Sequence, residues 1–221
     1  MPEPASDRPA VVIVHGLWMM PWAMGLLGAR LAARGLQVHY FGYHSLRATL
    51  EEDILALARF CARLHGPRLH WVGHSLGAAI VLEALRRGAL RGDGRVVLLA
   101  PPLREGLVVR RLSRFALGRA VLGRSLRQFY EDPPLAWSLP NELGILAGDR
   151  TIGMAMIVAP DLPSPNDGVI EVADTVLPGA REHRVLALGH TGLIVWPKAA
   201  ELTANFLLTG AFHVPAAQGH A

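Results

Sequence analysis

The sequence predicts an α/β fold in which a mostly parallel sheet is covered by helices on both faces. Two observations lead to this prediction. Short apolar runs rich in β-branched residues alternate with longer segments of helical periodicity, as in repeated strand–helix–strand units. The runs are apolar throughout, as expected for strands buried on both faces of a parallel sheet. With 221 residues, 51% of them hydrophobic, the chain is expected to form one domain spanning residues 1–221.

The first half of the chain gives the clearest alternation. Residues 10–14 (AVVIV) form a short apolar run and predict a strand. Residues 21–34 have helical periodicity and end at Gly35, a suitable helix C-cap. A second strand is expected at 36–41. A second helix is expected at 46–65, where apolar residues recur three and four positions apart before Gly66-Pro67.

The same alternation continues to the end of the chain. The strand expected at 95–100 stops at Pro101-Pro102, because proline cannot continue a strand ladder. Polar and proline-rich composition predicts loose ends at 1–8 and 211–221. Further strands are expected at 68–72, 143–148 and 184–188, and further helices at 78–87 and 197–208.

Residues 103–135 interrupt this rhythm between two expected strands. Their apolar residues recur every three, four or seven positions, which is helical spacing. Gly118 and Gly123 are expected to divide the segment into two short helices. Residues 103–130 hold seven arginines and one acidic residue, a net charge of +6, whereas the whole chain carries +4. We therefore expect a small basic helical cap, or lid, above the sheet.

The most specific motif is Gly73-His74-Ser75-Leu76-Gly77, which follows one expected strand and precedes one expected helix. A serine hydroxyl becomes a useful nucleophile when it stands clear of the surface and within reach of a base. A tight strand-to-helix turn exposes the serine in this way, and the flanking glycines remove Cβ atoms that would collide there. The motif predicts that Ser75 is a catalytic nucleophile.

A catalytic serine needs an imidazole base and a carboxylate that orients the imidazole. In a parallel sheet these groups are expected at the carboxyl ends of strands. Of the ten histidines, only His190 combines a strand end, a following helix and a late position. Asp167 is favoured as the acid, because the Asn166-Asp167-Gly168 turn fixes its side chain. Asp149 and Asp161 follow the same strand and stay open as alternatives.

The oxyanion of an acyl-transfer intermediate needs backbone N–H donors. The first donor is expected to be Leu76, the residue after the nucleophile, and the second Leu17, in the loop after the first strand. Bulky neighbours Trp18 and Met19, together with His74, are expected to line a substrate pocket, with ordinary core packing as the alternative.

These motifs together resemble those of the α/β-hydrolase superfamily, in particular its small bacterial lipases and esterases with little or no cap. The matching segments are His15-Gly16-Leu17, Gly73–Gly77, Asn166–Val169 and Gly189–Leu193, in an order that spans roughly residues 10–208. The resemblance implies the α/β-hydrolase fold, with Ser75 as nucleophile, Asp167 as acid and His190 as base. The segments 103–130 and 149–165 are longer than in minimal members of the group, which keeps Asp161 open as the acid.

The function expected on these grounds is hydrolysis of small-molecule carboxylic esters or lipids through an acyl-enzyme, with no metal and no organic cofactor. A phospholipase, a thioesterase or an acyltransferase would use the same residues. A non-catalytic interaction protein on a hydrolase fold is a further alternative, because fold alone does not fix function.

The remaining expectations concern partners and location. A single cysteine, Cys61, and an N-terminus with no apolar signal-like run predict a cytoplasmic protein. The basic segment 103–130 suggests peripheral contact with anionic membrane, against the alternative of a solvated face on a packed cap. Nucleic-acid binding is not expected, because no recognition motif accompanies these arginines.

Overall fold

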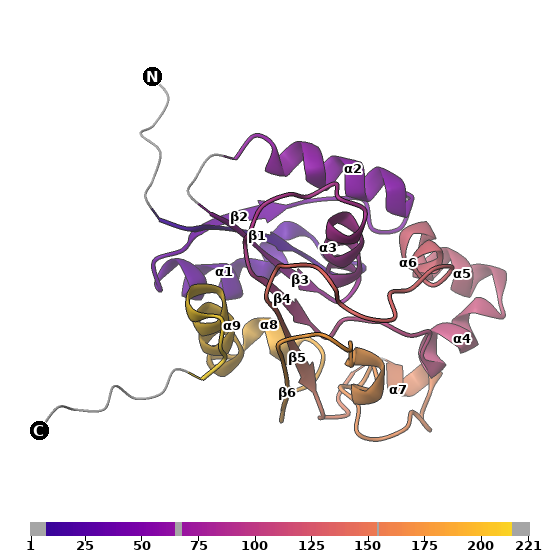
Figure 1. Cartoon of the computed structure of the whole chain (residues 1–221). Coiled ribbons are helices and arrows are strands. Elements are labelled where there is room, and N and C mark those ends of the chain that lie inside the picture. The colour runs from indigo at the N-terminus through magenta and orange to yellow at the C-terminus, as the bar shows by residue number, and fades with distance from the viewer. Residues whose placement is uncertain (1–7, 65–67, 154, 214–221) are drawn as a thin grey trace, which may run out of the picture.

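The computed structural model describes residues 8–64, 68–153 and 155–213, and the described part contains a six-stranded sheet (Figure 1). All neighbouring strands are parallel, which confirms the predicted fold class. In spatial order the strands are β2 (Gln37–Phe41), β1 (Ala10–Val14), β3 (Leu69–His74), β4 (Val96–Leu99), β5 (Leu143–Gly148) and β6 (Glu182–Leu186).

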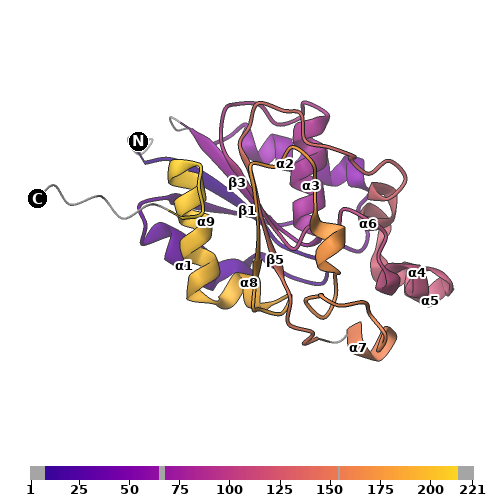
Figure 2. The same ribbon diagram turned by 60° about the horizontal axis from the view of Figure 1, so that its bottom comes forward.

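Alternate residues of the central strands pack into two separate cores. Val12 and Val14 face the core under helices α2 (Leu50–Cys61) and α3 (Leu76–Arg86). Val11 and Ile13 face the other core, under the helices on the opposite side of the sheet (Figure 2). Those helices are α1 (Gly25–Ala32), α8 (Gly192–Val195) and α9 (Pro197–Thr209). The strand sequences are apolar throughout because both faces are covered.

Some element boundaries differ from the sequence prediction. Helix α2 begins at Leu50 rather than at residue 46, because Thr49 and Glu52 form a capping box at its start. The end predicted at residue 65 lies outside the described residues. The last strand, β6, runs two residues earlier than predicted. The described residues also contain two short 3₁₀ helices, η1 (Pro21–Met24) and η2 (Val172–Thr175).

The cap contains three short helices rather than the predicted two: α4 (Leu107–Ser113), α5 (Ala116–Leu122) and α6 (Arg124–Phe129). Gly118 was expected to break a helix but lies inside α5. A Cβ atom there would lie 2.1 Å from the Leu112 carbonyl oxygen, so this glycine lets α5 pack against α4. The chain does break at Gly123, whose φ is +75°. Figure 2 shows α4 and α5 projecting beyond the sheet.

Two further segments depart from their predicted character. The loop after β5 contains a short helix, α7 (Ala155–Val158), which packs near α4. At the other end, Phe212 is fully buried, with its ring centroid 4.9 Å from that of Phe206. Residues 211–213 are therefore part of the packed body rather than a loose end. Residues 1–7 and 214–221, predicted to be loose, lie outside the described residues.

Candidate active site

Ser75 occupies a sharp turn between β3 and α3, at the carboxyl edge of the sheet. Its φ and ψ are +53° and −122°, a region that residues with a Cβ atom rarely adopt. The turn is fixed at both sides, because the Ser75 N–H donates to the Leu99 carbonyl at 2.9 Å and its carbonyl accepts from Ala78 at 2.9 Å. The packed sheet therefore stabilises a backbone conformation that projects this serine out of the fold.

The two glycines of the motif are required by close backbone contacts. A Cβ atom at Gly73 would lie 2.5 Å from the Ala78 Cα atom, and one at Gly77 would lie 2.3 Å from the Val14 carbonyl oxygen. Both distances are far below van der Waals contact. The first turn of α3 can therefore cross over β1 and β3 only if these two positions lack side chains.

Gly77→Ala is expected to destabilise the fold by about 1–3 kcal/mol, because the obstructing atoms belong to the backbone of β1 and cannot rotate away. The free energy of unfolding from urea titration measures this loss. Gly25→Ala is the matched control, because a Cβ atom at Gly25 meets no other atom within 4 Å. Equal stability of the Gly77 and Gly25 variants would contradict the crowding argument.

Asp167 and His190 are directly hydrogen-bonded. The His190 Nδ1 atom lies 2.7 Å from Asp167 Oδ2, and the His190 N–H donates to the Asp167 carbonyl at 2.8 Å. The other carboxylate oxygen, Oδ1, accepts from the N–H groups of Val169 and Ile170 at 2.9 and 2.7 Å. The carboxylate is almost fully buried, so these contacts fix its orientation toward the imidazole.

The Asp167 carboxyl is held in its ionised form. Burial opposes ionisation, but the His190 imidazole and the N–H groups of Ile170 and Val169 outweigh it and lower the pKa of Asp167 below its ordinary value. An acceptor-only carboxylate requires the proton of the imidazole on Nδ1. The Nε2 atom of a neutral His190 is then left as a proton acceptor, as a general base requires.

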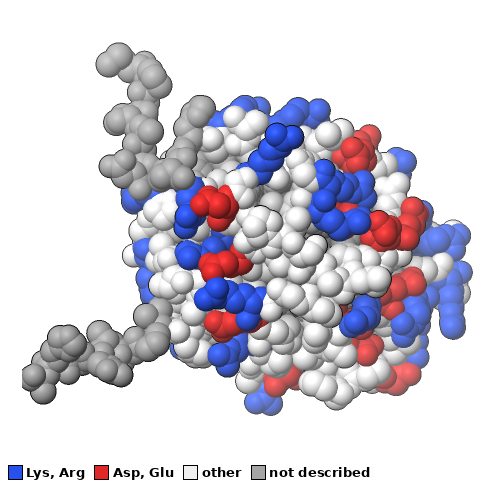
Figure 3. Space-filling view, in the orientation of Figure 1, with Lys and Arg blue, Asp and Glu red and all other residues white. Residues whose placement is uncertain are grey.

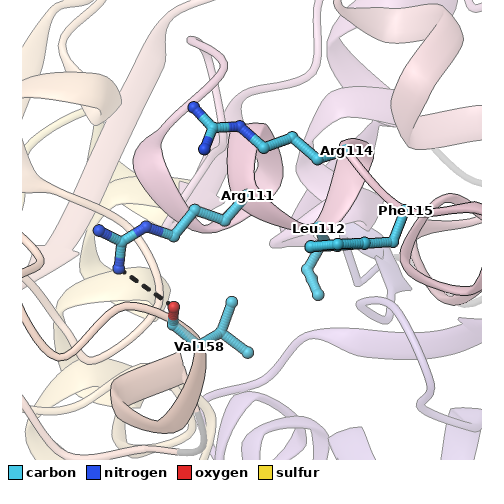
Figure 4. A pocket seen from close by; sticks show the side chains of 5 residues that line it. All are labelled: Arg111, Leu112, Arg114, Phe115 and Val158. Carbon is cyan, nitrogen blue, oxygen red and sulfur yellow. Dashed lines mark hydrogen bonds between the residues drawn. The ribbon is translucent and has the colours of Figure 1, made fainter.

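The alternative acids lie in different surroundings. Asp161 is exposed and forms a bidentate ion pair with Arg111 of α4, at 2.6 and 2.7 Å. Arg111 also donates to the Val158 carbonyl at 3.1 Å (Figure 4). Asp149 is an exposed residue directly after β5. The geometry therefore pairs His190 with Asp167, whereas Asp161 joins the cap to the loop that carries α7.

The loop after β1 is fixed against the rest of the molecule. The Tyr43 hydroxyl donates to the His15 carbonyl at 2.8 Å, and the Trp18 N–H donates to Ser45 Oγ at 3.2 Å. The Trp18 indole donates to the Val121 carbonyl of α5 at 2.9 Å. Sequence reasoning missed Tyr43 and Ser45, because only the packing of β2 beside β1 brings them to this loop.

Neither of the two predicted oxyanion donors uses its N–H group in a hydrogen bond within the described residues. In the described part of the chain, the Leu17 N–H donates no hydrogen bond. Leu76 is the first residue of α3, so its N–H has no acceptor within the helix. Trp18, directly after Leu17, has a φ of +61°.

Ser75 and His190 line one cavity of about 500 Å³ beneath the cap. The predicted pocket residues Trp18, Met19 and His74 lie on its wall, as does Leu17. Sequence reasoning missed the cap side of the wall, because helical periodicity does not reveal which face a short cap helix turns inward. Those cap residues are Val108, Val109, Leu112, Val121, Leu122, Leu126 and Tyr130.

His74 is a neutral part of the wall. Burial, followed by the neighbouring His190 ring, lowers the pKa of His74 to about 3. Its Nε2 atom lies 3.2 Å from the His190 carbonyl oxygen, and the two ring centroids are 4.7 Å apart. An uncharged ring in this place supports the His190 backbone without adding a competing charge to the site.

Within residues 8–64, 68–153 and 155–213, no group of three or more His, Cys, Asp or Glu side chains is placed to bind a metal ion. In the same residues, the helices are too short or too polar to cross a lipid bilayer.

A parallel sheet, a strained serine between β3 and α3, and an Asp–His pair at the same edge define the class of α/β-hydrolase folds. The chain belongs to the alpha/beta hydrolase family, whose model matches residues 11–197. The resemblance seen in the sequence is thus confirmed at the level of the superfamily.

Solved structures agree with this assignment of the fold. A lipase of Bacillus licheniformis in its propeptide form has a TM-score of 0.68 at 19% identity. The match covers 100% of this chain and 54% of the lipase, so this chain spans about half the length of the lipase. A metagenomic carboxyl esterase has a TM-score of 0.62 at 18% identity, with 90% and 75% of the two chains covered. The type II thioesterase of the borrelidin biosynthetic cluster has a TM-score of 0.60 at 20% identity, with 94% and 95% covered. The search of curated proteins returns no significant match. The family match and these structures agree on the α/β-hydrolase fold.

Proposed function

We propose that this protein is a serine hydrolase that cleaves carboxylic esters through Ser75, His190 and Asp167. The observation that carries the proposal is the 2.7 Å contact between Asp167 and His190, beside a cavity that His190 shares with the strained Ser75. A fixed carboxylate–imidazole pair that lines the same cavity as a serine is the arrangement that activates a hydroxyl nucleophile.

In the proposed reaction, Ser75 Oγ attacks the ester carbonyl while His190 Nε2 takes the hydroxyl proton. The Leu17 and Leu76 N–H groups bind the oxyanion of the tetrahedral intermediate. His190 then gives the proton to the leaving alcohol, and an acyl-enzyme remains on Ser75. Water attacks this acyl-enzyme by the reverse route and releases the acid. These steps use only residues of the chain, with no metal or organic cofactor.

The chemistry of the cavity favours an ester with an apolar acyl chain. The cap and the loop after β5 contribute eleven aliphatic side chains to its lining, and its volume is within the range of ligand pockets. A panel of p-nitrophenyl esters of increasing acyl length is expected to show activity that rises beyond acetate. Thioester and phospholipid members of the panel separate esterase activity from that of a thioesterase or phospholipase, and added alcohols detect acyl transfer.

The cap carries a surface that supports the proposed membrane contact. Phe115 and Leu117, around the start of α5, are 68% and 76% exposed, and Ile157 on α7 is 84% exposed. Among the seven arginines of residues 103–130, only Arg111 forms an ion pair in the described part of the chain. Figure 3 shows basic side chains along the edge where α5 lies, and in Figure 4 Arg114 extends away from Val158, unlike Arg111. Exposed apolar groups beside unpaired cations are suited to an anionic bilayer surface.

Reversing two of these charges, in Arg114→Glu/Arg119→Glu, is expected to weaken binding to vesicles that contain phosphatidylglycerol. The expected loss is about 2 kcal/mol or more, roughly 30-fold in affinity. Co-sedimentation measures it. Arg59→Glu/Arg91→Glu makes the same change of net charge on exposed residues outside the cap and is expected to bind like wild type. Equal binding of wild type to neutral and anionic vesicles would exclude the electrostatic contact.

A cytoplasmic location stays a prediction from the sequence.

A further inference from the structure

The wall of the cavity that contains Ser75 includes three polar side chains among its apolar ones. Tyr130 follows the last helix of the cap, Arg104 precedes its first helix, and Asp174 lies in η2, yet all three line the cavity that contains Ser75. None of them has a part in the reaction steps given above. The three side chains come from segments far apart in sequence, so the fold itself gathers them at this wall.

The Tyr130 hydroxyl lacks a protein partner. Its ring packs against that of Phe129, with centroids 5.6 Å apart, but over the described ranges of the chain no hydrogen bond uses its hydroxyl. Burial, together with the nearby Asp174 and Glu105 carboxylates, raises the pKa of Tyr130. The phenol therefore stays protonated and keeps its donor. A hydrogen-bonding group in such a wall is costly unless a ligand or water satisfies it.

The Asp174 carboxyl is a second hydrogen-bonding group that is open to a ligand. Arg104 donates to the Ala173 carbonyl at 2.9 Å rather than to this carboxyl. The Asp174 backbone is fixed, because its N–H donates to Glu171 at 3.0 Å and its carbonyl accepts from Leu103 at 3.1 Å. Burial first, and then Glu171, raise the pKa of Asp174, against the opposite effect of Arg104 and Arg110.

Gly106 leaves the space that this carboxyl occupies. A Cβ atom at Gly106 would lie only 2.9 Å from Asp174 Oδ2. Any larger residue at the start of α4 would therefore push the carboxyl away from its position. Gly106 lines the same cavity, so the carboxyl and the cavity wall meet at this point.

We propose that Tyr130 and Asp174 form a subsite for a hydroxyl group of the substrate. The phenol O–H donates to the substrate oxygen, and the substrate O–H donates to the Asp174 carboxylate. A plain alkyl chain would leave both groups unsatisfied. A substrate carboxylate would be repelled by the negative charge of Asp174. A substrate ammonium would be repelled by the positive charge of Arg104. This inference rests on the proposed ester hydrolysis, and it defines the substrate class as hydroxylated esters.

Two series of paired substrates test the subsite. The first contains p-nitrophenyl esters of one acyl length, with a hydroxyl group placed at successive carbons or absent. The second compares monoacylglycerols with alkyl esters of the same acids, so that a hydroxyl on the alcohol side is also sampled. In wild type, at least one hydroxylated member is expected to exceed its plain partner about tenfold in kcat/KM. Tyr130→Phe and Asp174→Asn are each expected to remove most of this preference.

The preference is the ratio of the kcat/KM values of two substrates, measured on one protein sample. Partial unfolding of a variant lowers both values by the same factor, so the ratio does not change. Tyr40→Phe and Asp93→Asn are the matched controls. The Tyr40 hydroxyl lies against Gly28 of α1, and Asp93 pairs with Arg68 on the surface. Both controls are expected to keep the wild-type ratio. The subsite is refuted if plain and hydroxylated esters are cleaved equally, or if the preference survives in both Tyr130→Phe and Asp174→Asn. Absence of turnover with every ester would instead refute the proposed function.

Discussion

Ser75→Ala is expected to lower kcat for p-nitrophenyl ester hydrolysis by about 10⁴- to 10⁶-fold, because no other group in the proposed reaction forms the acyl-enzyme. Wild-type protein is also expected to react with a fluorophosphonate probe, with the label on the peptide that contains Ser75. Steady-state kinetics and mass spectrometry of the labelled peptide measure the two effects.

Ser138→Ala is the matched control for this experiment. Ser138 is exposed in the segment that joins the cap to β5, and its removal is expected to leave both turnover and labelling unchanged. Ester turnover that persisted in pure Ser75→Ala protein would remove Ser75 from the mechanism. Wild-type protein that neither hydrolysed esters nor took up the probe would favour the non-catalytic interaction protein.

The second large effect is expected from Asp167→Asn, with a loss of about 10²- to 10⁴-fold in kcat. Asp167 Oδ1 accepts two backbone N–H groups, so an asparagine side chain keeps its oxygen there and turns its NH₂ group toward His190. That group cannot accept the Nδ1 proton. The imidazole then changes tautomer and presents a protonated Nε2 to Ser75. A protonated Nε2 cannot act as a base.

Asp161→Asn distinguishes between the two candidate acids. Asp161 pairs with Arg111, so its substitution is expected to leave kcat within a few fold of wild type while it loosens the contact between α4 and the loop with α7. An exposed ion pair contributes little to stability, so the variant is expected to fold. A larger loss of kcat in Asp161→Asn than in Asp167→Asn would reverse the assignment of the acid.

The sequence was sufficient where local pattern dictates structure. Apolar runs such as residues 10–14 predicted buried parallel strands, because only strands covered on both faces tolerate continuous hydrophobic sequence. The Gly73–Gly77 motif predicted a tight strand-to-helix turn, since glycines on both sides of the serine remove Cβ atoms that would collide there. Helix boundaries and the cap were predicted less well. Gly118 shows the reason: its role depends on Leu112 of the preceding helix, a contact that no local pattern encodes.

The amino-acid sequence was enough to predict the parallel α/β fold, the position of Ser75 at a strand end and the order in which the candidate serine, acid and histidine occur. Each of these follows from the chemistry of residues close together along the chain. The packing of the chain was needed to show which of three aspartates contacts His190, because that choice depends on a 2.7 Å approach between residues 23 positions apart. The same packing places Tyr130 and Asp174 in the apolar cavity, since it brings the end of α6 and η2 to one wall.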